Sequence, residues 1–257
     1  HWHDVRDWYR AFLNAGTRAD IVPLKYDWSA YKTVVLPTVI MLSAEDTQRL
    51  ADFAAAGGRV VIGYATGLID ENFHTWLGGY PGAGDGLLRE MLGIRGEEFN
   101  ILGAEAEGEP SEIRLSSGAV PRLWQNDVNV EVLATYEGEE ADEWELGGTA
   151  AITRNPYGSG ETYFVGCDLN VADLTEFVRE NIVEDSANVA NPTDSDVLHT
   201  VRKSADATFD FYLPRGKKEI ALQGIEGEPI YLFQAEAEEQ TGSYTVHRNG
   251  VLVVKRA

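Results

Sequence analysis

The most constraining feature of the sequence is a short buried strand that ends in an open turn. The apolar run Arg59–Tyr64 (RVVIGY) predicts a strand, and Ala65-Thr66-Gly67 follows it directly. In α/β domains of this type, the turn after such a strand displays a nucleophilic Cys or Ser. Because Ala65 and Thr66 stand here and no thiol is nearby, the sequence predicts a scaffold that has lost or never had its nucleophile.

Helices and strands alternate before this turn. Ser43 followed by Asp46 is a shortened capping box, which indicates the start of a helix. The predicted elements are a helix over 4–16, short strands over 21–22 and 33–36, and a helix over 43–57. Near-continuous apolar strands separated by helices are typical of a parallel sheet covered on both faces. We therefore predict an α/β fold with a flavodoxin-like parallel sheet.

After the turn, the chain is rich in glycine and then becomes irregular. Residues 69–86 form a long glycine-rich segment, and such a segment inside a compact domain is typical of a functional loop or of one that lies against a partner. A short helix over 87–92 precedes an acidic, irregular stretch that extends to about Gly118. The later predicted elements are a strand over 129–136, a hairpin with strands over 150–154 and 161–165, and a helix over 171–182.

A polar segment without periodicity divides the chain. Residues 184–195 include Pro192 and predict a linker. The later apolar runs are all strand-like and cover 197–201, 208–213, 219–222, 230–233 and 244–255. Asn249-Gly250 splits the last run and predicts a hairpin turn. We expect an α/β domain over 1–183, a linker over 184–195 and a small all-β domain, a β-sandwich, over 196–257.

The charge of the chain argues against anionic partners. The 257 residues include 21 basic and 42 acidic side chains, a formal net charge of −21, which repels nucleic acid and anionic membranes. No apolar run approaches the roughly 20 residues that span a bilayer, and no basic-then-apolar leader marks secretion. The chain enters a helix at once with His1-Trp2-His3, so we expect an upstream segment.

Few side chains are candidates for metal binding or catalysis. Cys167, the single cysteine, ends an apolar strand and is expected to be a buried structural thiol, which excludes metal sites built on CxxC spacing. The acidic segment 137–145 lacks the ligand spacing of a calcium loop and is expected to be a solvated loop tip. The five histidines are expected to be solvated or structural: His1, His3, His74, His199 and His247. We therefore expect neither a cofactor nor a metal.

The glycine-rich loop carries the residues that we expect at a subunit interface. The loop is too apolar to be left freely in water, and such a patch usually marks an interaction surface. The adjacent carboxylates Asp70 and Glu71 point apart on a strand end, so they are poor candidates for a shared acid/base site and fit a loop-ordering or interface ion pair better. The expected interface residues are Asp70, Glu71, Phe73, Trp76, Leu77 and Tyr80.

Several ordered segments of the chain carry a resemblance to a known family. They are Val35–Pro37, Ala54–Val61, Gly67–Asn72 (GLIDEN), Leu77–Gly82 (LGGYPG), Leu92–Ile94 with Glu97–Phe99, Val132–Tyr136, and Gly158–Gly160 with Tyr163–Gly166. In this order they resemble the middle domain of β-galactosidases of glycoside hydrolase family 42, and the last 60 or so residues resemble the terminal β-domain of the same family.

The resemblance implies a fold and a role. Family members have an N-terminal (β/α)₈ barrel, a middle domain that resembles class I glutamine amidotransferases and mediates trimer formation, and a small β-domain. Two glutamates of the barrel catalyse hydrolysis with retention. A barrel needs about 250 residues by itself, so no catalytic residue can be assigned to this chain. The resemblance implies the C-terminal portion of a cytoplasmic, homotrimeric β-galactosidase, or a truncated relative, whose galactoside substrate binds in the missing barrel.

Three other functions stay open at this point. A stand-alone amidotransferase needs a Cys at the turn with a His–Glu pair, and the turn lacks it. A carbohydrate-binding module could stack sugars on loop aromatics, for which Trp76, Tyr80, Trp124 and Trp144 are the candidates, although such residues are more often core or interface anchors. A solitary scaffold protein could associate with a separately encoded catalytic chain.

Overall fold

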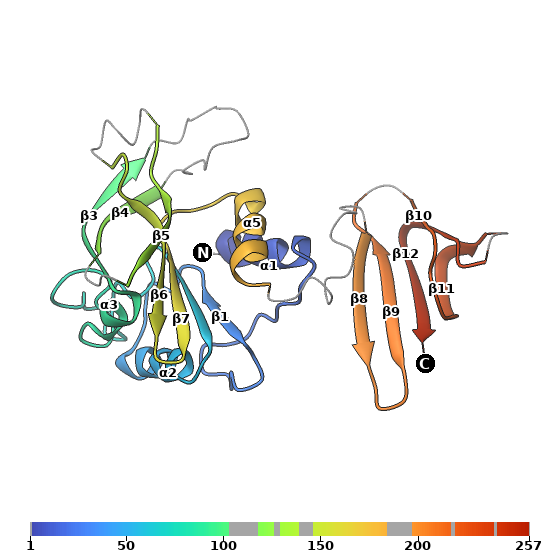
Figure 1. The fold of residues 1–257 in the computed structure, drawn as a ribbon, viewed down its shortest axis with the longest axis horizontal. Helices are drawn as coiled ribbons and strands as arrows, with labels where there is room; N and C mark the ends of the chain where they lie inside the picture. The colour runs from blue at the N-terminus through green and yellow to red at the C-terminus, as the bar shows by residue number, and fades with distance from the viewer. Residues whose placement is uncertain are drawn as a thin grey trace. The chain divides into compact units, whose positions relative to one another are not determined.

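The computed structural model describes residues 2–102, 118–125, 129–138, 146–183, 197–216, 219–238 and 241–256, although not the side chains of Trp2, 97–102 and 118–125 (Figure 1). The chain forms two compact units. Unit 1 comprises His1–Tyr9 and Asp20–Leu174, and unit 2 comprises Arg10–Ala19 and Thr175–Ala257. The predicted linker over 184–195 lies outside the described residues, as does most of the acidic segment 137–145.

Unit 1 contains a five-stranded mixed sheet with the order β1-β2-β7-β6-β5. Strands β1, β2 and β7 run parallel, and β7, β6 and β5 follow one another antiparallel. The expectation of a parallel sheet is thus correct for one part of it, and the predicted β6–β7 hairpin supplies the antiparallel part. The strands are β1 (Thr33–Leu36), β2 (Arg59–Gly63), β5 (Glu131–Thr135), β6 (Ala150–Tyr157) and β7 (Gly160–Val165).

The four described helices begin and end close to where the sequence predicts them. They are α1 (Trp2–Asn14), α2 (Ala44–Ala55), α3 (Leu87–Leu92) and α5 (Val171–Asn181). Helix α2 has the predicted cap, because Ser43 Oγ accepts a hydrogen bond from the Asp46 amide at 3.1 Å and donates one to Asp46 Oδ2 at 2.7 Å. Each cap bond satisfies a group that the helix end leaves without an intrahelical partner.

The core that positions the turn after β2 lies between the sheet and helices α2 and α3. Leu50 and Ala54 of α2 and Leu88 and Met91 of α3 are fully buried in it. From the sheet, the same core receives Leu36, Val60, Ile62 and Phe164. Burial of large apolar side chains contributes about 1.5–3 kcal/mol each, so this layer holds the carboxyl ends of β1 and β2 in fixed positions.

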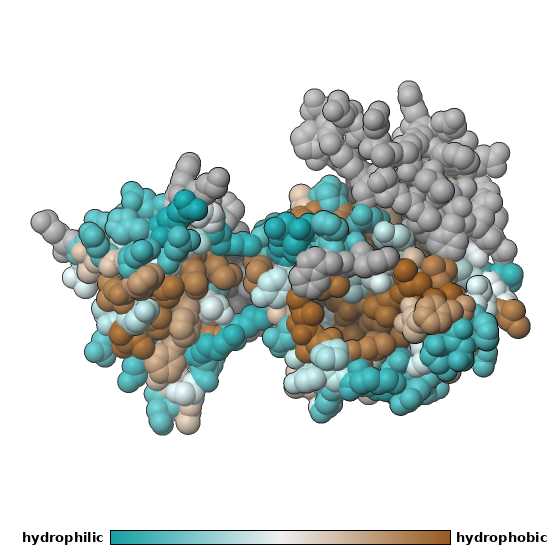
Figure 2. Space-filling view, turned by 180° about the vertical axis from the view of Figure 1, so that it is seen from behind, coloured by the Kyte–Doolittle hydropathy of each residue, from teal (hydrophilic) through white to brown (hydrophobic). Residues whose placement is uncertain are grey.

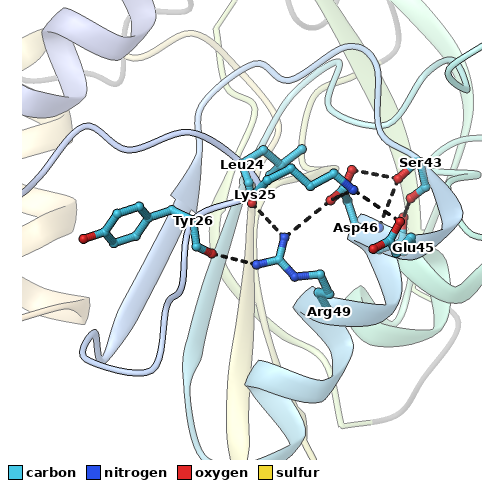
Figure 3. A network of polar contacts seen from close by, with 8 residues as sticks. Leu24, Lys25, Tyr26, Ser43, Glu45, Asp46 and Arg49 are labelled. Carbon is cyan, nitrogen blue, oxygen red and sulfur yellow. Dashed lines mark hydrogen bonds and ion pairs between the residues drawn. The ribbon is translucent and has the colours of Figure 1, made fainter.

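The segment before β1 has no strand at 21–22, contrary to the prediction, and is held by side-chain bonds from α2 (Figure 3). Arg49 donates to the carbonyl oxygens of Leu24 at 2.9 Å and Tyr26 at 2.7 Å. Its guanidinium also lies 4.2 Å from the centroid of the buried Trp28 ring. One arginine thus holds the segment that leads from the predicted strand into β1.

The acidic region after α3, expected to be irregular, contains a two-stranded antiparallel sheet. Strand β3 (Ile94–Leu102) pairs with β4 (Gly118–Gln125). Gly93 caps α3 in the left-handed region at φ 64°, so the chain turns directly from the helix into β3. Charged residues interrupt the apolar alternation of β3, which is why the periodicity did not indicate a strand.

Unit 2 contains one five-stranded antiparallel sheet, in place of the two facing sheets of the expected sandwich, among the residues that the structure describes. The predicted strands are all present, as β8 (Val197–Lys203), β9 (Thr208–Pro214), β10 (Ile220–Leu222), β11 (Glu228–Ala237) and β12 (Tyr244–Arg256). Strand β12 pairs with β9, β10 and β11. One face of the sheet buries Val246, Leu252 and Val254.

The hairpin predicted at Asn249-Gly250 is wrong. Both residues lie inside β12, at an irregularity where Val246 pairs with Ala235 and Val251 with Phe233. Asn249 has a φ of 63°, the conformation that its predicted turn also required. Pairing with β11 on both sides of this point keeps the two halves of β12 in one strand.

Candidate functional site

The turn after β2 has the strained backbone of an elbow. Strand β2 ends at Gly63, where a Cβ atom would lie 1.7 Å from the carbonyl oxygen of Pro37. Ala65 then adopts a φ of 60°, a conformation that costs a residue with a side chain about 1 kcal/mol. The amide of Thr66 closes the turn on the Gly63 carbonyl at 3.2 Å. The elbow is therefore present, and a methyl group occupies its strained position.

The neighbouring hydroxyl is used by the fold. Thr66 is fully buried; its Oγ1 accepts a hydrogen bond from the Val39 amide at 3.0 Å and donates one to the Leu36 carbonyl at 3.2 Å. A hydroxyl whose proton is donated to a backbone carbonyl in the core is not available as a nucleophile. Thr66 instead ties the elbow to the end of β1.

Two titratable groups lie near the elbow, and neither is activated. Cys167, which follows β7, is 2% exposed, and burial, followed by the charges of Asp168 and Asp173, raises the pKa of its thiol to about 12. Burial, followed by Asp168 and Asp4, raises the pKa of the half-buried Tyr64 to about 12. An activated thiol needs a lowered pKa. The predicted burial of Cys167 is confirmed, and its raised pKa is the opposite of what an activated thiol needs.

The loop that follows is ordered by Asp70. Its Oδ1 accepts hydrogen bonds from the amides of Asn72 and His74, both at 2.8 Å, and its own amide donates to the His74 carbonyl at 2.8 Å. These backbone hydrogen bonds hold the pKa of Asp70 below its ordinary value. The loop-ordering alternative for Asp70 is thus what the structure shows, while Glu71 points into solvent.

The tip of this turn presents an aromatic side chain. Phe73 has a φ of 65° and is 74% exposed, and Leu77 is 88% exposed. Gly78 and Gly79 follow at positive φ, and Arg89 of α3 donates to the Gly79 carbonyl at 2.5 Å. Arg89 was not singled out from the sequence, because the carbonyl that it binds lies ten positions earlier and no local pattern relates the two. Two large apolar side chains are therefore presented by a braced loop.

The other two aromatic residues of the loop, Trp76 and Tyr80, which the sequence analysis also expected at a subunit interface, face inward in this chain. Tyr80 is 8% exposed, and its ring lies edge-on to that of Phe164 with centroids 6.1 Å apart. Trp76 is half-buried and packs against the same core. A side chain at Gly82 would lie 2.5 Å from Trp76 Cβ, so this glycine permits the close packing. Tyr80 and Trp76 therefore fix the loop to the core of its own domain.

The remaining candidates have structural surroundings. His74 Nδ1 lies 3.6 Å from Asp70 Oδ2, and His247 Nδ1 lies 3.1 Å from Glu219 Oε2. His199 Nε2 lies 2.7 Å from Oδ1 of the buried Asp210, and the His199 ring stacks on that of Tyr212. His1, Trp144 and the side chain of Trp124 lie outside the described parts. Within those parts, no three His, Cys, Asp or Glu side chains form a metal-binding group, and no helix is long and apolar enough to cross a membrane.

Known proteins match the chain along its whole length. The family described as the beta-galactosidase trimerisation domain matches residues 1–189. Beta-galactosidase BbgII of Bifidobacterium bifidum is 34% identical over 268 residues, covering 100% of this chain and 37% of the relative. A beta-galactosidase of Arthrobacter sp. is 30% identical over 205 residues, covering 79% of this chain and 28% of the relative.

Two solved structures share the fold. The cold-adapted beta-galactosidase of Rahnella sp. R3 aligns with a TM-score of 0.77 at 23% identity, over 100% of this chain and 37% of that one. A catalytic mutant of Gan42B, a family 42 beta-galactosidase from G. stearothermophilus, aligns with a TM-score of 0.78 at 22% identity. The alignment covers 99% of this chain and 36% of that one. The chain thus matches between 28% and 37% of the length of these proteins.

Proposed function

Because the chain belongs to the β-galactosidase trimerisation domain family of glycoside hydrolase family 42, we propose that it is the non-catalytic oligomerisation and scaffold region of a β-galactosidase. The parent enzyme hydrolyses terminal β-D-galactosyl groups with retention, and its catalytic barrel lies outside this chain. The family match, which covers residues 1–189, is the observation that carries the proposal.

The α/β domain, over 1–183 in this proposal, is amidotransferase-like and has kept the elbow without its chemistry. The strained Ala65, the core-bonded Thr66 hydroxyl and the buried Cys167 support this view. Retention of a strained turn without a reacting group is understandable if the domain is kept for assembly. The free thiol is compatible with the reducing cytoplasm in which we place the parent enzyme.

The subunit contact is made by the loop of 70–80, with Phe73 and Leu77 as its anchors. Their exposure on a braced turn supports this role, because a rigid side chain loses little conformational entropy when it is buried in an interface. Asp70 holds the turn, Glu71 lies on the rim, and Trp76 and Tyr80 fix the loop to its own core. A homotrimer needs a heterologous contact, in which this loop meets a different surface of the neighbouring subunit.

The test is light scattering on the full gene product carrying Phe73→Asn together with Leu77→Ser. We expect trimers to dissociate at a protein concentration at least about 30-fold higher than in the wild type, since one aromatic anchor contributes about 2 kcal/mol to each subunit contact. Ile21→Ser, which removes an apolar residue that is 59% exposed elsewhere in unit 1, is the matched control. Trimers of unchanged strength in the double variant would place the contact elsewhere.

Activity provides the second test. The full gene product is expected to hydrolyse a chromogenic β-galactoside, and the 257-residue chain is expected to show no turnover above a buffer blank. Turnover that follows the concentration of the repurified chain would contradict the scaffold role. An inactive full gene product would contradict the assignment to a β-galactosidase.

A further inference from the structure

The Asn249-Gly250 pair lies where β12 departs from regular pairing with β11. The ladder pairs Val246 and Val251 of β12 with residues of β11 that are two positions apart, so residues 247–250 stand opposite Gln234 alone. Gln234 itself has a φ of 45°. Extra residues on one strand form a bulge and lie outside the ladder. The ladder therefore constrains the backbone around Asn249 less than it constrains the paired halves of β12.

The geometry of this bulge favours both residue types of the pair. Asn249 has a φ of 63°, a conformation that asparagine adopts more readily than most residues with a side chain. A Cβ atom at Gly250 would lie 2.5 Å from the carbonyl oxygen of Gln234 and 2.7 Å from that of His247, so glycine is required there. The bulge thus sets an asparagine directly before a glycine, a pair that occurs once in the sequence.

The side chain of Asn249 is exposed to water. Apolar residues gather over the surface of the sheet of unit 2 (Figure 2), whereas residues 247–249 are polar. Among the described residues, no hydrogen bond holds the Asn249 carboxamide. The exposed Asn170 differs, because its Nδ2 donates to Asp173 Oδ2 at 2.7 Å and its Oδ1 accepts from the Ala172 amide at 2.8 Å. The Asn249 carboxamide is therefore free to rotate toward its own backbone.

An asparagine in this setting can react with the backbone nitrogen that follows it. Hydroxide takes the Gly250 amide proton, and the nitrogen attacks Cγ of Asn249 to form a five-membered succinimide. The bond from Cγ to the side-chain nitrogen breaks, and that nitrogen takes a proton from water and leaves as ammonia, which regenerates hydroxide. Water then opens either imide carbonyl and yields aspartate or isoaspartate. Glycine assists because no side chain stands beside the attacking nitrogen.

We propose that Asn249 is a site of spontaneous deamidation in the folded protein. The aspartate product adds one negative charge beside His247, which already pairs with Glu219 and Glu236. The isoaspartate product routes the backbone through Cβ and lengthens it by one atom. This insertion falls in β12, the shared partner of β9, β10 and β11, so it weakens the sheet of unit 2. The proposal is independent of the β-galactosidase assignment.

Peptide mapping by mass spectrometry tests the reaction on the full gene product stored in mildly alkaline buffer. We expect aspartate and isoaspartate to appear at Asn249 at least about tenfold faster than at Asn170, which is followed by the branched Val171. The rate should rise with pH, because the attacking nitrogen must lose its proton. Equal rates at the two asparagines would overturn the proposal. Conversion at Asn249 only in urea would show that the folded bulge protects it and would overturn the proposal as well.

Two variants separate the chemistry from its consequence. Asn249→Gly tolerates the positive φ and lacks the carboxamide, so the stored variant should keep its thermal unfolding midpoint. Fresh Asn249→Asp carries the added charge without the added backbone atom. We expect the stored wild type to unfold at a lower temperature than fresh Asn249→Asp. Equal midpoints would overturn the proposed weakening of the sheet, and an equal loss in stored Asn249→Gly would assign the damage to another site.

Discussion

Two turns of unit 1, eight positions apart, hold a residue with a side chain at nearly the same positive φ. Ala65 has a φ of 60° and Phe73 a φ of 65°. At the elbow, the strained residue is a methyl group beside a core-bonded hydroxyl and a buried thiol. At the loop tip, it is a phenyl ring that is 74% exposed. Strain of this kind persists only where the surroundings enforce it. The first turn keeps the geometry of a reactive site, whereas the second presents an apolar surface.

The largest expected effect concerns the thiol behind the elbow. With a pKa of about 12, roughly one Cys167 thiol in 10,000 is ionised at pH 8, and only the thiolate reacts. We expect labelling of the native chain by a thiol reagent to be about 1,000-fold slower than after unfolding, where the pKa is about 8.5. Because the folded state keeps the proton between these two pKa values, the stability contributed by Cys167 falls as the pH rises above about 8.5.

Rapid labelling of Cys167 in the native chain would show that the thiol beside the elbow is reactive, and the elbow would then not differ from a reactive site. If it were accompanied by glutamine hydrolysis that Cys167→Ser abolishes, the elbow would have amidotransferase chemistry after all. Labelling that is slow in the native chain and fast in urea is the expected pair of results.

A second prediction concerns the close backbone contact at Gly63, where the elbow begins. Gly63→Ala places a methyl group against the Pro37 carbonyl, which neither backbone can avoid, and should lower the free energy of unfolding by about 3 kcal/mol or prevent folding. Gly148→Ala is the control, since its Cβ meets nothing within 4 Å and its φ of 75° costs about 1 kcal/mol. Urea denaturation measures both. Equal losses would mean that the elbow relaxes easily.

Removal of the Thr66 hydroxyl has the next largest expected effect on the free energy of unfolding. Thr66→Val leaves the partly buried Val39 amide and the buried Leu36 carbonyl without this partner, which should cost about 2 kcal/mol of unfolding free energy. Thr75→Val, in the exposed part of the loop, should change it by less than about 0.5 kcal/mol. Equal thermal unfolding of the two variants would show that the hydroxyl does not hold the elbow.

The smallest expected effect is a gain in stability, whereas the two preceding substitutions lower it. Phe73→Asn replaces a residue that is strained at positive φ with one that tolerates it, and should raise the stability of the 257-residue chain by about 0.5 kcal/mol. The same change weakens association in the full product if Phe73 is an anchor. Lower stability in urea would show that Phe73 packs on its own domain and that the two turns do not differ in role.

The sequence predicted the elbow because its strand, its glycine and its missing nucleophile are local features. The exposure of Phe73 and Leu77 was also predictable from apolar residues among glycines. The inward orientation of Tyr80 was not, since it depends on Phe164 and on the close approach at Gly82. Asn249-Gly250 misled for the same reason: pairing with β11 keeps β12 in one strand where the local signal predicted a hairpin. Tertiary contacts decided both cases.

The position of β12 in unit 2 has a consequence for synthesis. It is the last strand of the sheet to be translated and the shared partner of β9, β10 and β11. The β8–β9 hairpin can close on its own, but among the described strands β10 and β11 pair with β12 alone, which has yet to emerge from the ribosome. During that interval, the apolar run of β11 is exposed in a growing chain whose unit 1 strands are already complete. The final strand to be made is therefore the one that gives β10 and β11 their backbone partners and shortens the time that their unpaired edges are open to other nascent chains.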